Sequence, residues 1–272
     1  EYSMAELSPL IKESPAALCA YDLLFHDLLG LIAGIPLYRI LGGYRNRIQT
    51  SVTIPLGSVD ESVDVAERWC RQGFRMLKIK GGLSPEEDVQ RIRAIRRALP
   101  GIILRLDADG AYTTQQALDV ARALKDHLEM IEQPVRQDDL EGLQQITKAS
   151  PVPVLADQSV SGPDSALRLA SERRVHGISI KVASCGGLKV ARQMDAIAQA
   201  AQAVTMVGCL VEPALLIAAG LSFALSSPNV KYGDLDGHLD LLNDPTRLGF
   251  SLKDGWLTAT DTPGLGCTVD LC

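Results

Sequence analysis

Five charged residues recur at nearly even intervals along the chain, and this spacing restricts the fold more than any other feature. They are Lys80, Asp107, Glu132, Asp157 and Lys181, and the intervals between them are 27, 25, 25 and 24 residues. Each residue lies at the end of a short run rich in aliphatic and β-branched residues, and a polar loop and an amphipathic stretch follow. An interval of this length accommodates one strand and one helix of an α/β protein. We therefore expect the five charges at one height, on the carboxyl ends of parallel strands.

Eight such β-rich runs alternate with helical patterns. The predicted strands are 50–56, 75–80, 103–109, 128–132, 152–157, 177–182, 204–209 and 230–234. Eight parallel strands favour closure into a (β/α)8-type barrel, which typically takes about 250 residues, and the chain has 272. Because no linker-like stretch interrupts residues 46–248, we predict a single barrel domain there.

Local signals mark where helices begin and end. Ser84 and Pro85, with Glu87 three residues after the serine, are typical of a helix N-terminus. Thr113 and Gln116 have the same spacing. Residues 14–43 are apolar at helical spacing and end in two glycines, which is typical of a helix C-terminus. The tail from residue 249, rich in glycine, aspartate and proline, is predicted to be an irregular return segment.

Composition and charge disfavour several kinds of partner. The net charge of −6 and the isoelectric point near 5.3 argue against nucleic acid and anionic membranes, since both attract basic surfaces. No stretch approaches the ~20 consecutive apolar residues of a membrane span, and residues 210–225 are predicted to form a buried helix. The six scattered cysteines favour free thiols in a cytoplasmic protein. The four histidines are not clustered, so a bound metal ion would need oxygen ligands.

Side-chain alternation predicts where the charged residues point. Lys78 and Lys80 are two residues apart and share one face of their strand, whereas Leu77 and Ile79 point to the other face. Because the apolar face must meet the outer helices, we expect the lysines, and Lys181 by the same reasoning, to point into the barrel mouth.

The three carboxylates Asp107, Glu132 and Asp157 would repel one another at the barrel mouth unless a cation held them. Oxygen ligands without histidine or cysteine favour Mg²⁺. A metal-bound substrate carboxylate would then present its α-carbon between the amines of Lys80 and Lys181. Removal of an α-proton creates an enediolate with two negative charges, which a divalent metal stabilises. Lys78 next to Lys80 would lower the pKa of Lys80, as a base requires.

These residues form motifs that resemble the muconate-lactonizing subgroup of the enolase superfamily, and within it dipeptide epimerases of the L-Ala-D/L-Glu type. The motifs are Lys78-Ile79-Lys80, Asp107-Ala108-Asp109, Glu132-Gln133-Pro134, Asp157-Gln158-Ser159 and Lys181 followed by Gly186-Gly187. The resemblance runs from about residue 15 to the C-terminal region, so it covers nearly the whole chain.

The resemblance implies a modified (β/α)7β barrel and a role for each site residue. Asp107, Glu132 and Asp157 would bind one Mg²⁺ per subunit, and Lys80 and Lys181 would exchange acid and base roles on the two faces of the α-carbon. Lys78 would tune Lys80 or contact the substrate. The substrate would be a small carboxylate, and a dipeptide is indicated by Asp234 and Asp236, which match the Asp-x-Asp that binds the dipeptide ammonium group. Further substrate contacts are implied at Thr53, Cys209 and Val211, and the chain is expected to form a homo-oligomer.

The chain also departs from the family pattern. Asp109-Gly110 stands where the family usually has Asn-Gln, and Gln158 stands where it usually has glutamate. Family members begin with an α+β capping domain, of which residues 1–45 would supply only the last helices, and residues 249–272 would return toward this cap.

Several alternatives remain open at this point. Within the superfamily they are muconate cycloisomerase, o-succinylbenzoate synthase and N-acylamino acid racemase, which would not need Asp234 and Asp236 to meet an ammonium group. A Schiff-base barrel aldolase using Lys181 is an alternative of another class. A further alternative is a catalytically impaired remnant that lacks its cap.

Overall fold

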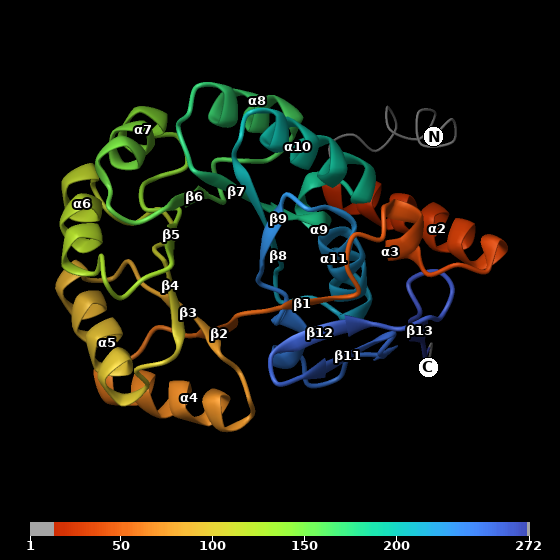
Figure 1. Ribbon diagram of the computed structural model, residues 1–272, viewed down its shortest axis with the longest axis horizontal. Coiled ribbons are helices and arrows are strands. Elements are labelled where there is room, and N and C mark those ends of the chain that lie inside the picture. The colour runs from red at the N-terminus through yellow and green to blue at the C-terminus, as the bar shows by residue number, and fades with distance from the viewer. Residues whose placement is uncertain (1–13, 271–272) are drawn as a thin grey trace.

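The computed structural model describes residues 14–270, and its centre is a closed barrel of eight parallel strands (Figure 1). In order around the barrel the strands are β2 (Val52–Ile54), β3 (Met76–Lys80), β4 (Ile103–Asp107), β5 (Met130–Glu132), β6 (Val154–Ala156), β7 (Gly177–Lys181), β8 (Val204–Gly208) and β9 (Val230–Gly233). A parallel bridge between Thr50 and Gly233 joins the last strand to the first. All eight predicted strands are confirmed, with each end within two residues of its predicted position.

Seven helices follow the first seven strands and cover the outside of the barrel (Figure 1). They are α4 (Val59–Arg71), α5 (Pro85–Ala98), α6 (Thr114–Ala123), α7 (Leu140–Ala149), α8 (Pro163–Ser171), α10 (Leu188–Ala200) and α11 (Ala214–Ser226), and the short helix α9 (Val182–Cys185) precedes α10. A 3-10 helix, Gly237–Asp240, follows β9, so the barrel has the expected (β/α)7β form. The predicted N-caps are confirmed, since Ser84 and Thr113 accept bonds from the backbone of Glu87 and Gln116.

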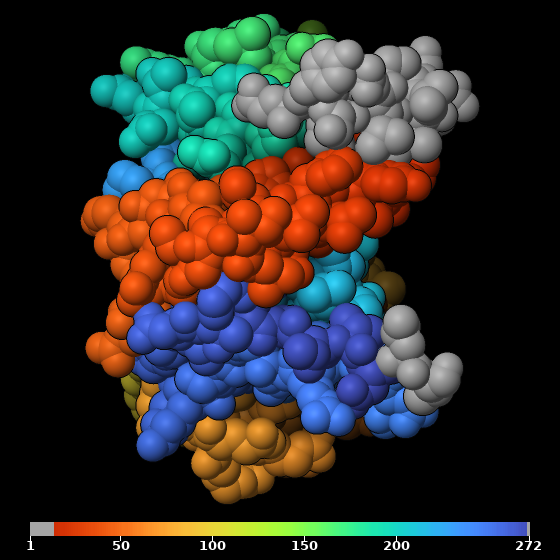
Figure 2. Space-filling view, turned by 90° about the vertical axis from the view of Figure 1, so that its right-hand side faces the viewer, coloured from red at the N-terminus to blue at the C-terminus, as the bar shows by residue number. Residues whose placement is uncertain are grey.

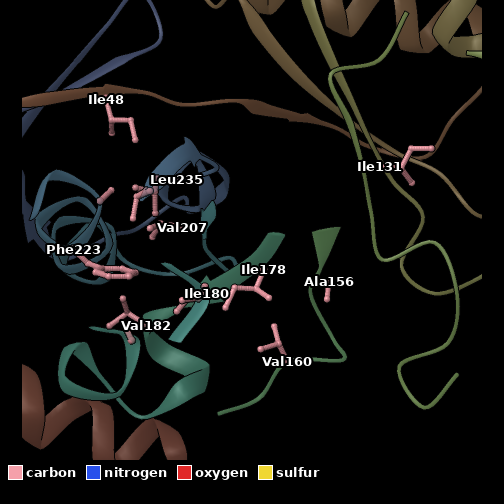
Figure 3. Close-up of a cluster of buried hydrophobic side chains, with 14 of the residues drawn as sticks. Ile48, Ile131, Ala156, Val160, Ile178, Ile180, Val182, Val207, Phe223 and Leu235 are labelled. Carbon is pink, nitrogen blue, oxygen red and sulfur yellow. The ribbon is translucent and has the colours of Figure 1, made fainter. Parts of the chain in front are cut away.

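The core lies between the strands and the outer helices. Leu77, Ile79, Ile178 and Ile180 are all at most 1% exposed, and Figure 3 shows the last two with neighbouring aliphatic and aromatic side chains. Burying aliphatic side chains outside the barrel contributes about 1.5–3 kcal/mol each. The alternation of the strand then leaves only the inside of the barrel for Lys78, Lys80 and Lys181.

The C-terminal tail forms strands, so its prediction as an irregular segment was wrong. β11 (Phe250–Lys253) and β12 (Trp256–Ala259) form an antiparallel sheet with β1 (Arg47–Gln49), and β10 (Thr246–Arg247) pairs with β13 (Thr268–Val269). The edge of β1 supplies hydrogen bonds that a sequence pattern for the tail alone does not reveal. The Arg47 guanidinium also lies 4.6 Å from the centre of the Trp256 ring.

Helices α2 (Pro15–Ala33) and α3 (Leu37–Leu41) lie against both the barrel and the tail. Figure 2 shows them, in red and orange, directly on the blue C-terminal segment, and the Leu37 amide donates to the Gly264 carbonyl at 2.7 Å. Among the described residues α2 is the one helix long and apolar enough to cross a membrane. Its buried residues Cys19, Asp22 and Leu23 pack inside the protein, whereas its opposite face exposes leucine and isoleucine side chains.

Asp22 connects α2 to the barrel, and its loss is expected to destabilise the protein. Its carboxylate is buried and accepts hydrogen bonds from the amides of Leu188 and Lys189, at 2.6 and 3.3 Å, at the start of α10. Asp22→Ala would leave these buried donors without an acceptor, which costs about 2 kcal/mol. Urea unfolding measures this change. The control Asp119→Ala removes an exposed carboxylate from α6, and an equal effect of the two variants would contradict the prediction.

Candidate active site

The carboxyl ends of the barrel strands bring the predicted charged residues to one level. Lys80 on β3 pairs in register with Asp107 on β4, and Asp107 pairs with Glu132 on β5. Asp157 follows β6 directly, and Lys181 is the last residue of β7. Because β3 and β7 are four strands apart in a closed barrel of eight, Lys80 and Lys181 lie on opposite sides of the carboxylates.

Lys78 occupies the centre of the cluster. Its Nζ lies 2.9 Å from Asp107, 2.8 Å from Glu132 and 2.8 Å from Asp234. Burial of this ammonium group lowers the pKa of Lys78, but the three carboxylates have the larger combined effect and raise it well above its usual value. Lys78 is therefore a fixed positive charge that connects Asp234 to the other two carboxylates.

Lys80 lies nearer the barrel mouth, with about a third of its side chain exposed. Its Nζ is 2.8 Å from both Asp107 and Asp109. Burial and the neighbouring Lys78 lower the pKa of Lys80, as the sequence predicts, but Asp107 outweighs them and the net pKa is raised. The predicted effect of Lys78 on the pKa of Lys80 therefore has the expected sign, but in this arrangement Asp107 outweighs it.

Lys181 is paired with Asp157, whose oxygen lies 2.6 Å from the lysine Nζ. Burial lowers the pKa of Lys181, and Asp157 more than offsets it, so the net pKa is raised. Gly208 is the register partner of Lys181 on β8. A Cβ atom at Gly208 would lie 2.9 Å from the Ser179 Oγ, so glycine leaves room for this hydroxyl, and 3.4 Å from the Lys181 stem, an ordinary van der Waals contact.

The buried carboxylates differ sharply from one another in acidity. Burial raises the pKa of Asp107, but Lys78 and Lys80 outweigh it and lower that pKa to about 2. Glu132 is buried next to Lys78 and three aspartates, and burial is the main cause that raises its pKa to about 8. One oxygen of Glu132, Oε1, is buried without a hydrogen-bond partner. This oxygen is available for a further positive charge.

The carboxylates suit a divalent cation in their chemistry. Six of them, Asp107, Asp109, Glu132, Asp157, Asp234 and Asp236, surround the three ammonium groups of Lys78, Lys80 and Lys181. Full ionisation would leave three negative charges in excess, so the cluster as a whole attracts cations. Within residues 14–270 no three acidic, histidine or cysteine side chains converge closely enough to hold a metal ion, since the lysines lie between the carboxylates. The hard oxygen donors and the unpartnered Glu132 Oε1 nevertheless fit Mg²⁺.

Asp234 and Asp236 follow β9 and contact β2 and the residue that precedes it. The Ser51 hydroxyl donates to Asp234 Oδ1 at 2.6 Å, and the Thr53 amide donates to Asp236 Oδ2 at 2.7 Å. Cys209 Sγ lies 3.6 Å from Asp236 Oδ1. Burial and Asp234 raise the pKa of Asp236 to about 6. Thr53, through its amide, and Cys209, through its thiol, thus lie beside Asp236, and their contact with a substrate stays a prediction.

Val211 is the one predicted contact residue that stands apart from this cluster in the described part of the chain. Its side chain is 64% exposed, and the loop that carries it follows β8. The neighbouring loop residue Leu210 is close to Gly237, where a Cβ atom would collide with the Leu210 carbonyl. The loop therefore packs on the Asp234–Gly237 segment, with apolar side chains left exposed.

Gln133, the middle residue of the Glu132-Gln133-Pro134 motif, supports the site from the loop after β5. Its backbone has φ of 36°, which is uncommon for a residue with a side chain. Gln133 Oε1 accepts from the amides of Asp157 and Ser159, at 2.9 and 3.1 Å, so it holds the loop that carries Asp157. A glutamine after Glu132 gives no periodic signal from which this role could be predicted.

The two departures from the family pattern are in contact with each other. Gln158 Nε2 donates to Asp109 Oδ1 at 2.9 Å, and the other oxygen of Asp109 binds Lys80. The family pattern has asparagine and glutamate at these positions, so amide and carboxylate have exchanged places. The exchange leaves the total charge of the pair unchanged.

Comparison with known proteins gives the same family as the site. The enolase C-terminal domain-like family matches residues 61–271. The L-Lys-D/L-Arg epimerase of Desulforapulum autotrophicum is 37% identical over 97% of this chain and 75% of its own length. The L-Ala-D/L-Glu epimerase of Bacillus subtilis is 34% identical over 98% of this chain and 74% of its own length.

A solved structure agrees with these relatives. The dipeptide epimerase of Enterococcus faecalis, complexed with Mg and the dipeptide L-Leu-L-Tyr, superimposes with a TM-score of 0.94 at 34% identity. The match covers 98% of this chain and 78% of that one. The homologues are thus epimerases that act on dipeptides, and the shared fold includes the barrel that carries the charged cluster. The family match over most of the chain and the agreement of the structures show that this chain belongs to the enolase C-terminal domain-like family.

Proposed function

We propose that the protein catalyses Mg²⁺-dependent epimerisation of a dipeptide, by 1,1-proton transfer at the carbon next to the carboxylate. The observation that carries this proposal is the arrangement of Lys80 and Lys181 on opposite sides of the buried carboxylates. Epimerisation requires one group to remove the α-proton from one face and another to deliver a proton to the opposite face. Two amines separated by half the barrel meet this requirement.

Asp107, Glu132 and Asp157 are the residues that would hold Mg²⁺. When bound, the ion would stabilise the negative charge that develops on the substrate carboxylate as the α-proton leaves. Lys80 and Lys181 become effective bases only when Asp107 and Asp157 share their charge with another cation, because these carboxylates now raise the pKa of both lysines. Each lysine would then take or give the proton on its own face, according to which epimer is bound.

Asp234 and Asp236 support a dipeptide rather than an N-acylated amino acid as the substrate. Both are nearly fully buried, at 3% and 6% exposure. Asp234 is paired with Lys78 at 2.8 Å, whereas no ammonium or guanidinium group within residues 14–270 forms an ion pair with Asp236, and an unpaired buried carboxylate is costly. A dipeptide ammonium group would add the positive charge that this end of the cluster lacks. The substrates of cycloisomerases and of N-acylamino acid racemases have no such group.

The contacts of Lys181 do not favour the Schiff-base aldolase. A lysine that forms an imine must be neutral to attack a carbonyl group. Burial alone would favour neutrality, but Asp157 at 2.6 Å raises the pKa of Lys181. Loss of activity on chelation, without borohydride trapping of an adduct, would separate the two reactions.

We propose further that residues 14–45 and the tail seat an α+β capping unit above the barrel. The part of the predicted segment formed by residues 1–13 lies outside the described residues. An exposed apolar stripe on α2 supports the proposal, and it consists of Leu24, Leu28, Leu31 and Ile32.

The free thiols of the five described cysteines are compatible with a cytoplasmic location, and the homo-oligomer remains a proposal.

Exchange of the α-hydrogen with deuterated water tests the proposed function. The wild-type protein would be incubated with Mg²⁺ and a library of cationic, acidic and apolar dipeptides, because the relatives include epimerases named for each of these kinds. Mass spectrometry would detect a gain of one deuterium in the residue that is epimerised. Incorporation with at least one dipeptide class is expected, and its absence from every dipeptide would refute the proposal.

The exchanged Asp109–Gln158 pair gives a prediction for this activity. Gln158→Glu alone would set two carboxylates at hydrogen-bond distance beside Lys80, and we expect kcat/KM to fall about tenfold. The double variant Asp109→Asn with Gln158→Glu restores the hydrogen bond with its direction reversed. We expect its kcat/KM to return to within about threefold of the wild type. A double variant no more active than Gln158→Glu would show that the pair does not act as a unit.

A further inference from the structure

Two buried residues outside the predicted site, Arg105 and Ser51, form a chain of hydrogen bonds that ends on Asp234. We propose that Arg105 and Ser51 are positioning residues, which fix the Asp234 carboxylate, and through it Lys78, for recognition of the substrate ammonium group. The assignment rests on the proposed dipeptide epimerase function and names the residues that prepare its ammonium site. It concerns residues on β4 and on the segment before β2 that do not contact the carboxylates proposed to hold Mg²⁺.

The donor and acceptor in each of these hydrogen bonds follow from the chemistry of the groups. Arg105 Nη1 lies 3.3 Å from Ser51 Oγ, and a guanidinium can only donate, so the serine oxygen is the acceptor. The serine hydrogen must then point to an acceptor of its own. Asp234 Oδ1 lies at 2.6 Å and the Gly233 carbonyl at 3.4 Å, so the shorter bond, to the carboxylate, is favoured. Arg105 thereby sets the orientation of the hydroxyl that binds Asp234.

Arg105 is itself held on several sides. It is 1% exposed, its Nη1 also donates to the Gly233 carbonyl at 2.9 Å, and its Nε donates to Glu129 at 2.7 Å. Its guanidinium lies 5.1 Å from the centre of the Tyr232 ring, a distance typical of a cation–π contact. A buried charge with so many fixed contacts costs reorganisation energy to move. It therefore keeps Ser51 and the end of β9 in a defined geometry.

Both oxygens of Asp234 are thus occupied within the protein. Oδ1 accepts from Ser51 and Oδ2 accepts from Lys78 at 2.8 Å. Lys78 reaches Asp107 and Glu132 from the same position. The orientation of Asp234 consequently sets the geometry of the ammonium site, while Asp107 and Glu132 keep Lys78 at the centre of the cluster. Asp236 accepts from the Thr53 amide on Oδ2 and has the long thiol contact on Oδ1, and no ammonium or guanidinium group within residues 14–270 pairs with it, so it can accept an incoming ammonium group.

Ser51→Ala tests the assignment, because it removes the hydroxyl from a site that is 0% exposed and deletes a single oxygen atom. With the Mg²⁺-loaded full chain and the best dipeptide from the exchange library, we expect KM to rise about tenfold while kcat stays within about threefold. Arg105→Lys keeps the positive charge, but one ammonium group cannot donate to Ser51, Gly233 and Glu129 at the same time. We therefore expect KM to rise in this variant as well. If Arg105 acts on Asp234 through Ser51, the KM of the double variant should be no higher than that of the single variant with the larger effect.

Thr205→Ala is the matched control, since it removes another fully buried hydroxyl of the barrel, which bonds Asn229 away from the carboxylates. We expect its KM to equal that of the wild type. An unchanged KM for Ser51→Ala, or additive effects in the double variant, would overturn the assignment. A general loosening of the barrel would instead lower kcat and the melting temperature, which is measured in parallel. If the wild type turns over no dipeptide, the proposed function itself fails, and the assignment fails with it.

Discussion

Lys181→Met is expected to lower the epimerisation rate on the order of 10³-fold, the effect of losing a positioned general acid or base. Methionine fills nearly the volume of the lysine stem, which packs against Gly208, so the barrel should remain folded. Without the amine, one face of the substrate α-carbon has no proton donor or acceptor, and neither epimer can be converted into the other. Polarimetry or chiral chromatography of the dipeptide measures this loss.

Isotope exchange makes the prediction specific to a mechanism with two bases. In Lys181→Met the amine of Lys80 is still present on the opposite side of the barrel. We therefore expect one epimer to exchange its α-hydrogen with deuterated water without inversion, and the other epimer to remain inert. Lys80→Met should show the opposite preference. Equal loss of exchange for both epimers in both variants would contradict the assignment of one lysine to each face.

A control variant separates these effects from a change of surface charge. Lys148→Met removes an exposed lysine from the last turn of α7, far along the helix from the strand ends. We expect wild-type rates and wild-type exchange with both epimers. A similar loss in this variant would show that the assay responds to charge or stability rather than to the active-site amines.

The fold could be predicted from the sequence because its signals are local and periodic. The register of Lys80, Asp107 and Glu132 on neighbouring strands follows directly from intervals close to one strand and helix. The burial of Leu77 and Ile79 outside the barrel likewise follows from alternation within one strand. Such signals do not require knowledge of which distant residues meet.

The parts that could not be predicted depend on contacts between distant segments. Ser51 meets Asp234 only because a bridge between Thr50 and Gly233 closes the barrel, and nothing in the local sequence of Ser51 indicates this partner. The β-structure of the tail depends in the same way on the edge of β1. The pKa of Lys80 was predicted from one neighbour, Lys78, whereas its direction is decided by the closer contact with Asp107.

Glu132→Gln is expected to lower activity on the order of 10³-fold, because a metal ligand that stabilises transition-state charge contributes several kcal/mol. The Glu132 carboxylate is not needed to keep Lys78 in place, since that lysine retains Asp107 and Asp234 at 2.9 and 2.8 Å. The wild type treated with a chelator should lose activity to a similar extent and recover it when Mg²⁺ is added. The variant should stay inactive at every Mg²⁺ concentration that restores the wild type.

The same variant should not be less stable than the wild type when a chelator is present. Burial and the neighbouring carboxylates raise the pKa of Glu132 from 4.5 to about 8, so the folded protein holds a proton that the unfolded chain releases. Between these two values the stability of the wild type must fall as the pH rises. Glutamine does not titrate, so the fall in stability that is due to Glu132 is absent from the variant. We expect the melting temperature of Glu132→Gln to equal or exceed that of the wild type at pH 8.

Melting temperatures measured from pH 5 to pH 8.5 in chelator, with and without the substitution, test this expectation. A carboxylate whose main role is a structural ion pair with Lys78 would give the opposite result, because its removal leaves a buried ammonium group less well paired and lowers the melting temperature. If Glu132→Gln is more stable than the wild type but inactive, the buried Glu132 carboxyl group lowers the stability of the protein and is required for the reaction. This is the outcome we expect for a residue that binds the metal, and it separates Glu132 from Asp107, whose pKa of about 2 indicates a carboxylate already stabilised by Lys78 and Lys80.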